Sequence, residues 1–205
     1  MKKFTIALIF TCVSLHAFAQ SQAETYIKEA QEFLAKKDYK QAQLSLQDAI
    51  NDINNLLAKQ VADLFPAEIN GLKADGDATT NSAGMGMLGG GMQIEKKYRN
   101  DAKKQDADIQ IIANSPMLAN LNMFMTNPSM MGQEYKSVRV GTDRAILKST
   151  TENGDGGKKI RATEIQLPLG QTLITIHTNG LASEQEELAF ANKLDLEKIK
   201  AALGN

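Results

Sequence analysis

Residues 145–162 read AILKSTTENGDGGKKIRA, and this stretch decides the class of fold. Ala145 and Leu147 mark one strand and Ile160 and Ala162 begin another, because apolar residues two positions apart lie on the same face of a strand. Asn-Gly and Gly-Gly pairs between the two segments are typical of a hairpin turn. The stretch therefore predicts two antiparallel strands joined by a turn at 151–157.

The same alternation extends the sheet in both directions along the chain. Beyond Ala162 the apolar period shifts at Glu164-Ile165, which predicts a β-bulge in that strand. Short strands with tight turns between them favour an antiparallel sheet over a βαβ arrangement. The four other predicted strands are 92–98, 109–113, 138–140 and 173–178.

Two helices are predicted to accompany this sheet. Ser115-Pro116 is a helix start, and the helix that follows ends at Asn127-Pro128. A capping box at Ser183 begins a C-terminal helix, and Asp195 is placed to cap a separate last turn. The acidic residues of that helix's first turns are expected to form a solvated face: Glu184, Glu186 and Glu187. Residues 67–205 thus predict an α+β domain with about six antiparallel strands, one inserted helix and a C-terminal helix.

An α-hairpin is predicted at residues 20–66. Apolar residues recur at helical spacing from Ala23 to Asp38 and again from Tyr39 to Leu64, and Pro66 ends the second helix. The turn at 35–42 resembles that of a single tetratricopeptide repeat, which implies a peptide-docking unit. A stable solenoid needs about three such repeats. We therefore expect a hairpin that packs its apolar stripe against the sheet domain.

Residues 1–19 have the pattern of a signal peptide. Lys2 and Lys3 precede an apolar stretch from Phe4 to Leu15, and Ala17-Phe18-Ala19 supplies small residues at a cleavage site. Cleavage after Ala19 would export the chain to the periplasm with no cysteine and no transmembrane segment. Lipidation at Cys12 is the alternative, although apolar residues flank it on both sides.

Charge and composition exclude several classes of function. The formal net charge is −1 for the whole chain, and without Lys2 and Lys3 it is −3. A chain without an excess of basic residues is not expected to bind nucleic acid. Aromatic residues make up 5% and tryptophan is missing, which argues against surfaces that stack on bases or sugars. The expected partners are another envelope protein or an apolar ligand.

Several short motifs resemble those of uncharacterised secreted proteins of Gram-negative bacteria. The resemblance covers roughly residues 64–200 and implies no catalytic group. The strand order is also similar to the Mog1/PsbP-like α+β fold, an analogy of architecture that assigns no reaction. The motifs are Leu64-Phe65-Pro66, Gly89-Gly90-Gly91, Tyr98-Arg99, Asn114 to Leu118, Asn127-Pro128 and Met130-Met131-Gly132.

Candidate catalytic residues are few. His177 is the only histidine beyond the signal peptide, and it lies on a strand, on the same face as Leu173 and Thr175. A Ser–His–Asp site would have to use it, and no Gly-x-Ser-x-Gly elbow is present. We therefore expect a non-catalytic protein without a cofactor. An enzyme that uses carboxylates alone would leave no signature in the sequence.

Methionine is the unusual component of this chain. Eight of nine fall within residues 85–131, several in segments rich in glycine, asparagine or proline. Three interpretations stay open: core packing, an adaptable apolar binding surface, or a Cu(I) or Ag(I) site built from thioethers. The metal version would use Met85, Met87, Met130 and Met131. The candidate binding residues, expected to lie near one another, are Met85, Met87, Met92, Met123, Met125, Met130 and Met131.

Overall fold

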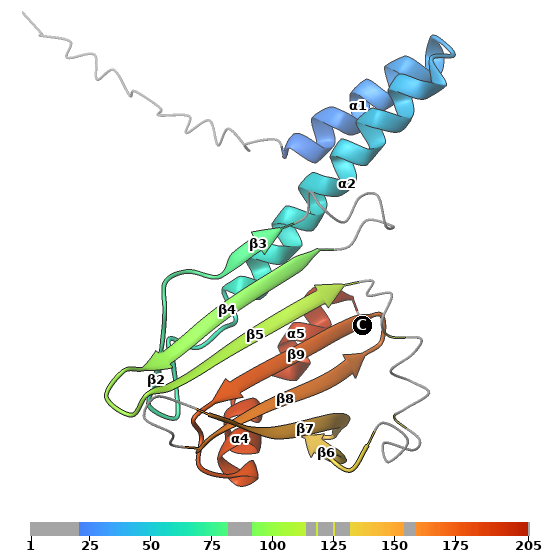
Figure 1. Cartoon of the computed structure of the whole chain (residues 1–205). Helices are drawn as coiled ribbons and strands as arrows, with labels where there is room; N and C mark the ends of the chain where they lie inside the picture. Colours follow the sequence, from blue (N-terminus) through green and yellow to red (C-terminus); the bar gives the residue numbers. More distant parts are fainter. Residues whose placement is uncertain are drawn as a thin grey trace, which may run out of the picture.

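Two antiparallel helices precede one antiparallel sheet, and two short helices end the chain (Figure 1). The computed structural model describes residues 21–81, 92–113, 118, 125, 132–153 and 159–204. The predicted α+β class is confirmed. The helices are α1 (Gln22–Ala35), α2 (Tyr39–Ala62), α4 (Glu184–Ala191) and α5 (Leu196–Leu203). The strands are β1 (Glu68–Ile69), β2 (Leu72–Ala74), β3 (Thr79–Asn81), β4 (Gln93–Asn100), β5 (Gln105–Ala113), β6 (Tyr135–Val140), β7 (Asp143–Asn153), β8 (Lys159–Leu169) and β9 (Thr172–Asn179).

The sheet joins its early and late strands through one long pairing. In the described residues its order is β1-β2-β4-β5-β9-β8-β7-β6, with β3 also paired to β4, and every pair is antiparallel. The pairing of β5 with β9 runs from Asp106 opposite Asn179 to Ala113 opposite Thr172. The centre of the sheet is therefore made by segments that are distant in the sequence.

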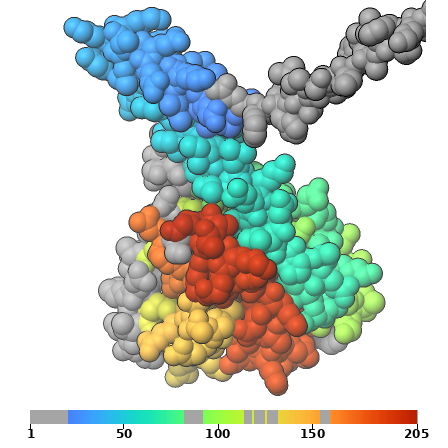
Figure 2. Space-filling view, turned by 180° about the vertical axis from the view of Figure 1, so that it is seen from behind, coloured from blue at the N-terminus to red at the C-terminus, as the bar shows by residue number. Residues whose placement is uncertain are grey.

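Helices α4 and α5 and the C-terminal part of α2 cover one face of the sheet. Ile94, Ile109 and Ile176 are fully buried there against Phe190 and Ile199 of the C-terminal helices. Figure 2 views this helical side, where α5 lies beside the C-terminal part of α2. Alternate residues of the same strands point to the opposite face, which we call the open face.

The six predicted strands correspond to β4–β9, and the structure adds three. Strands β1, β2 and β3 are two or three residues long, too short for a period of two to be recognised. The C-terminal helical region is split into α4 and α5, and Asp195 accepts a hydrogen bond from Lys198 N at 3.1 Å at the start of α5. The predicted cap at Asp195 is confirmed.

The predicted bulge at Glu164-Ile165 is wrong. Strand β8 pairs without interruption with β7 from Ile146 to Asn153 and with β9 from Thr172 to Asn179. The apparent period shift arises because Ile160 and Ala162 lie on the open face, whereas Ile165 faces the helices. Thr163 occupies the inward position before Ile165 and is 4% exposed, so a polar residue interrupts the apolar pattern.

The carboxylate of Glu187 explains why the polar residue Thr163 faces inward. The prediction that Glu187 belongs to a solvated face is wrong. Its side chain is 0% exposed. Arg161 donates to both carboxylate oxygens, from Nε at 2.6 Å and from Nη2 at 3.0 Å. The hydroxyl of Thr163 donates to Oε1 at 2.7 Å. A buried carboxylate needs such partners, and β8 supplies them from its inward-facing positions.

The α-hairpin packs against the sheet domain only at its base, so the expected full packing of its stripe is wrong. Ala58 and Val61 of α2 belong to the main core, which thus extends across the predicted domain boundary at 66/67. Helix α1 and the part of α2 that comes before Ala58 project away from the sheet (Figure 1). Several large apolar side chains of the projecting part are therefore exposed.

Some expectations fall outside the described residues. These are the signal peptide, the glycine-rich segment at 84–91, the turn at 154–158, and the inserted helix except for Leu118 and Met125, both helical. None of the described helices is long and apolar enough to cross a membrane.

Candidate functional site

A line of charged side chains crosses the open face. In the strand register, Lys97 of β4 lies opposite Asp108 of β5, and Asp108 lies opposite His177 of β9. His177 is in turn opposite Glu164 of β8, and Glu164 is opposite Lys148 of β7. Directly opposed residues of antiparallel strands have Cβ atoms about 5 Å apart. These five residues, called the charged row below, place an imidazole between two carboxylates and a lysine beyond each carboxylate.

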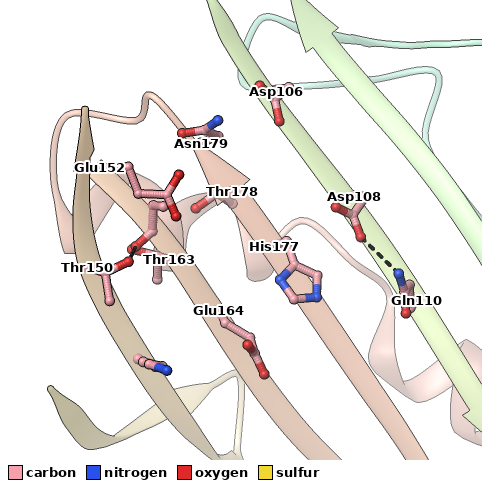
Figure 3. Close-up of a pocket in the computed structure, with 12 residues that line it drawn as sticks. Asp106, Asp108, Gln110, Thr150, Glu152, Thr163, Glu164, His177, Thr178 and Asn179 are labelled. Atoms are coloured by element: carbon pink, nitrogen blue, oxygen red, sulfur yellow. Dashed lines mark hydrogen bonds between the residues drawn. The ribbon is translucent and has the colours of Figure 1, made fainter. Parts of the chain in front are cut away.

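A depression of about 520 Å³ lies over four residues of this row, all but Lys97, and opens widely to solvent. Figure 3 shows the side chains that line it. Its lining carries four carboxylates against one ammonium group and one imidazole. The site is therefore negative at neutral pH, whichever charge the imidazole carries. The lining residues are Asp106, Asp108, Gln110, Lys148, Thr150, Glu152, Ala162, Thr163, Glu164, His177, Thr178 and Asn179.

Side-chain amides hold the two carboxylates that flank His177. Gln110 Nε2 donates to Asp108 Oδ2 at 3.4 Å, and the amide of Gln166 donates to Glu164. Each amide lies two residues from its carboxylate on the same strand, so it shares the same face of the sheet. The carboxylates are thus positioned before any ligand arrives.

Burial raises the pKa of Asp108 and outweighs the opposing attraction of His177. Burial also raises the pKa of Asp106, against a hydrogen bond from Asn179 that lowers it. A carboxylate whose negative charge is disfavoured in this way gains from a cation that comes close. The site is electrostatically prepared for a positive group.

One unsatisfied polar atom lies at the same place. Among the described residues, Asn179 Oδ1 is a buried side-chain oxygen with no hydrogen-bond partner, and Asn179 lines the depression on the same face as His177. Thr178 Oγ1 is also unpartnered, but Thr178 lies opposite Thr163 and points to the helical side of the sheet. Buried polar atoms are generally hydrogen-bonded, so the free oxygen of Asn179 is available to a polar group or water in the hollow.

An apolar cluster occupies another part of the open face. Leu118, Ile146 and Leu173 are buried together, and Met125 and Tyr135 pack against them. Ile146 lies two residues before Lys148 on β7, and Leu173 precedes His177 on β9, so the cluster adjoins the charged row. The open face therefore combines a polar hollow with an apolar boundary.

Two of the seven candidate methionines are in the described residues. Met92 belongs to the main core and is 2% exposed, whereas Met125 is half-buried in the apolar cluster. Met92 O accepts a hydrogen bond from Ala113 N at 3.0 Å. The residues that flank segments 82–91 and 114–117 are thus neighbours. Met85, Met87, Met123, Met130 and Met131 lie outside the described residues.

The sequence singled out His177 but none of its neighbours in the row. Asp108, Glu164 and Lys148 are scattered along the chain, and only the pairing of β5, β9, β8 and β7 brings them together. The available signal was a charged residue at an outward position of each strand, which is also what any solvated strand shows. Among the described residues, no group of three or more His, Cys, Asp or Glu side chains is arranged to hold a metal ion.

Comparison with known proteins adds no assignment to this geometry. No protein-family model matches the chain, and no curated protein shows significant sequence similarity to it. The functional argument therefore depends on the site itself.

Proposed function

We propose that this protein is a non-catalytic binding protein of the periplasm whose open face holds a polar, positively charged ligand. The observation that carries the proposal is the excess of carboxylates, four against one lysine, in a hollow on the sheet face opposite α4 and α5. A polyamine or the basic side chains of a peptide have the matching chemistry. The amides at Gln110 and Gln166 add hydrogen-bonding groups that orient such a ligand.

The shape of the hollow favours binding over catalysis. It opens widely to solvent, and charges in such a site are screened by water. Catalytic sites gain most of their electrostatic effect by excluding water and fixing donors around the reacting atoms. His177 has carboxylates on both flanking strands, an arrangement that suits ion pairing. An open, rigid sheet surface therefore supports recognition.

Titration calorimetry with spermidine and with a trilysine peptide tests this proposal. We expect binding that weakens as salt increases, and affinity about 5-fold lower in Asp108→Asn and in Glu164→Gln, since a partly solvated ion pair contributes about 1 kcal/mol. Glu197→Gln is the matched control, because Glu197 is an exposed acid on α5 in the helical layer. Equal weakening by the control, no binding of either probe, or turnover of a bound peptide would refute the proposal.

The periplasmic location rests on the signal-peptide pattern of residues 1–19. Expression of the full chain in a Gram-negative host, followed by fractionation and N-terminal sequencing, tests it. We expect a periplasmic chain that begins at Gln20. A cytoplasmic chain that keeps Lys2 and Lys3 would contradict this part of the proposal.

A second candidate function concerns the methionines, and the contact between Met92 O and Ala113 N favours it. Because the flanks of the two methionine-rich segments are adjacent, we propose that their thioethers form an adaptable apolar surface or a Cu(I) site. Replacing Met85, Met87, Met130 and Met131 together by leucine keeps the apolar area but removes the sulfur. A competition assay that finds equal Cu(I) affinity in both proteins would eliminate the copper version.

A further inference from the structure

The projecting part of the α-hairpin carries an exposed apolar face. On α2 it consists of Tyr39, Leu46, Ile50 and Ile53, whose steps of seven, four and three residues align them along one side of the helix. Helical-wheel geometry places Ile27 and Leu34 of α1 on the same side of the hairpin. These six side chains, the hairpin stripe, are between 38% and 66% exposed.

The stripe is exposed because the two helices pack through small residues. Ala23 and Ala30 of α1 are buried against Ala42, Ser45 and Ala49 of α2. This close approach leaves the larger apolar side chains beside the helix contact and outside it. The hairpin therefore presents its large apolar residues to the solvent.

The stripe also continues a face that packs inside the protein. Leu57 and Val61 extend the same spacing along α2, and Leu64 follows just beyond its end. Val61 belongs to the main core, and Leu57 and Leu64 pack against that core. This face of α2 is therefore covered wherever the sheet domain lies against it. Beyond the domain, it has no covering element among the described residues.

We propose that a second copy of this chain covers the hairpin stripe, with the two hairpins antiparallel about a two-fold axis near Leu46. Tyr39 and Ile53 lie seven residues to either side of Leu46. The axis therefore sets Tyr39 against Ile53 of the partner subunit, and Leu46 against its own equivalent. The part of α2 that precedes its contacts with the core runs from Tyr39 to Leu56. It is as long as the segment of the partner hairpin that would lie against it.

Charge selects the antiparallel arrangement. The tip of the hairpin, residues 32–44, carries three lysines against Glu32 and Asp38, a net charge of +1. Towards the base, residues 21–31 and 45–56 carry four acids against Lys28, a net charge of −3. The backbone N–H of Ala23 donates to Asp52 Oδ2 at 2.8 Å, which fixes the level at which α1 begins beside α2. An antiparallel pair brings each basic tip to the partner's acidic base. A parallel pair would place two net-positive tips together and two net-negative bases together.

The size and composition of the stripe suit such an interface. Six half-exposed large apolar side chains leave on the order of 500 Å² of apolar surface, at the upper end of the largest patch on a typical monomer. Gln31, Gln43 and Gln47 border the stripe, and with them the surface approaches the roughly 800 Å² per partner of a standard interface. The stripe itself contains no charged residue, as the centres of interfaces rarely do.

Sedimentation velocity on the full chain, and on its variants, tests the dimer. We expect a concentration-dependent dimer, and Leu46→Glu to weaken it about 100-fold by placing a charge at the centre of the interface. Leu44→Glu is the matched control: Leu44 is 51% exposed and Leu46 is 44% exposed, but Leu44 lies about 200° around the helix from Leu46. A monomer at every concentration, with or without binding to anionic vesicles, overturns the proposal, as does equal weakening by both variants.

Cysteine cross-linking tests the direction of the hairpins. In a Cys12→Ser background, a mixture of Tyr39→Cys and Ile53→Cys chains is oxidised, and each variant is also oxidised alone. We expect a disulfide between the two different chains, because a disulfide needs Cα atoms within about 7 Å. Cross-linking of Tyr39→Cys to itself alone would show a parallel pair and overturn the antiparallel arrangement. These readouts do not depend on the ligand proposed for the open face.

Discussion

Asp108 and His177 lie directly opposite each other on adjacent antiparallel strands, at the centre of the open face. Burial raises the pKa of this carboxyl, and the imidazole only partly opposes that effect. The structure therefore keeps a charge that folding alone would not favour. Such a cost is expected where a charge serves recognition.

Replacement of Asp108 is predicted to separate binding from stability. Asp108→Asn removes a carboxylate that the folded state disfavours, so the free energy of unfolding at neutral pH should rise. The gain should be less than about 1 kcal/mol, because solvent screens a half-buried site. The same variant should bind spermidine more weakly. Urea unfolding and calorimetry on one preparation measure both, and a variant that loses stability together with affinity would contradict the proposed role.

Stability should also depend on pH through this residue. An unfolded aspartate titrates near its ordinary pKa of about 3.9, whereas burial raises the pKa of Asp108 in the folded state. The folded protein thus holds the proton to higher pH than the unfolded chain does. The stabilisation is complete below the ordinary pKa and is lost as pH rises through the raised pKa. Urea unfolding of the wild type and Asp108→Asn should give curves that diverge only across that interval. Parallel curves would refute the assignment to Asp108.

The sequence predicted the elements of this fold better than its surfaces. Apolar alternation identified β4–β7, because one face of each strand meets the helices and the period is strong. It located β8 through Ile160 and Ala162, which lie on the open face, and β9 was recognised as the run from Leu173 to Thr178. It failed at Thr163, where a polar residue faces inward to bind Glu187. It also misjudged the hairpin, since helical spacing shows that a face is apolar but not what covers it. The charged row depends on the order of strands in the sheet. Asp108 of β5 lies beside His177 of β9, although β6, β7 and β8 come between them in the sequence.

Tyr98 is predicted to hold the base of the hairpin to the sheet. Its ring meets Phe190 edge-on, with centroids 5.7 Å apart and planes at 84°, and its hydroxyl donates to Pro66 O at 2.9 Å. Tyr98→Phe should cost about 1 kcal/mol, the net value of one hydrogen bond, and Phe190→Ala about 4 kcal/mol. Burial also raises the pKa of Tyr98 to about 12. An ultraviolet titration should therefore show one tyrosine that ionises near pH 12 and that disappears in Tyr98→Phe.

The buried pair of Arg161 and Glu187 is predicted to be the most sensitive ionic contact between the sheet and α4. Arg161→Ala leaves the fully buried carboxylate with only the Thr163 hydroxyl, and loss of one partner of a buried pair typically costs about 3 kcal/mol. Arg161→Lys restores the charge but not the two-point contact, so it should recover only part of this loss.

Arg99→Ala is the control for this pair. Arg99 lies 3.4 Å from Asp75 at the surface, with its side chain 57% exposed. An exposed pair contributes little, so its loss should change the free energy of unfolding by less than about 0.5 kcal/mol. Urea unfolding of the three variants gives the comparison. If Arg161→Ala costs no more than Arg99→Ala, Glu187 does not depend on Arg161, and the contact between β8 and α4 must be held by the Thr163 hydroxyl and apolar packing.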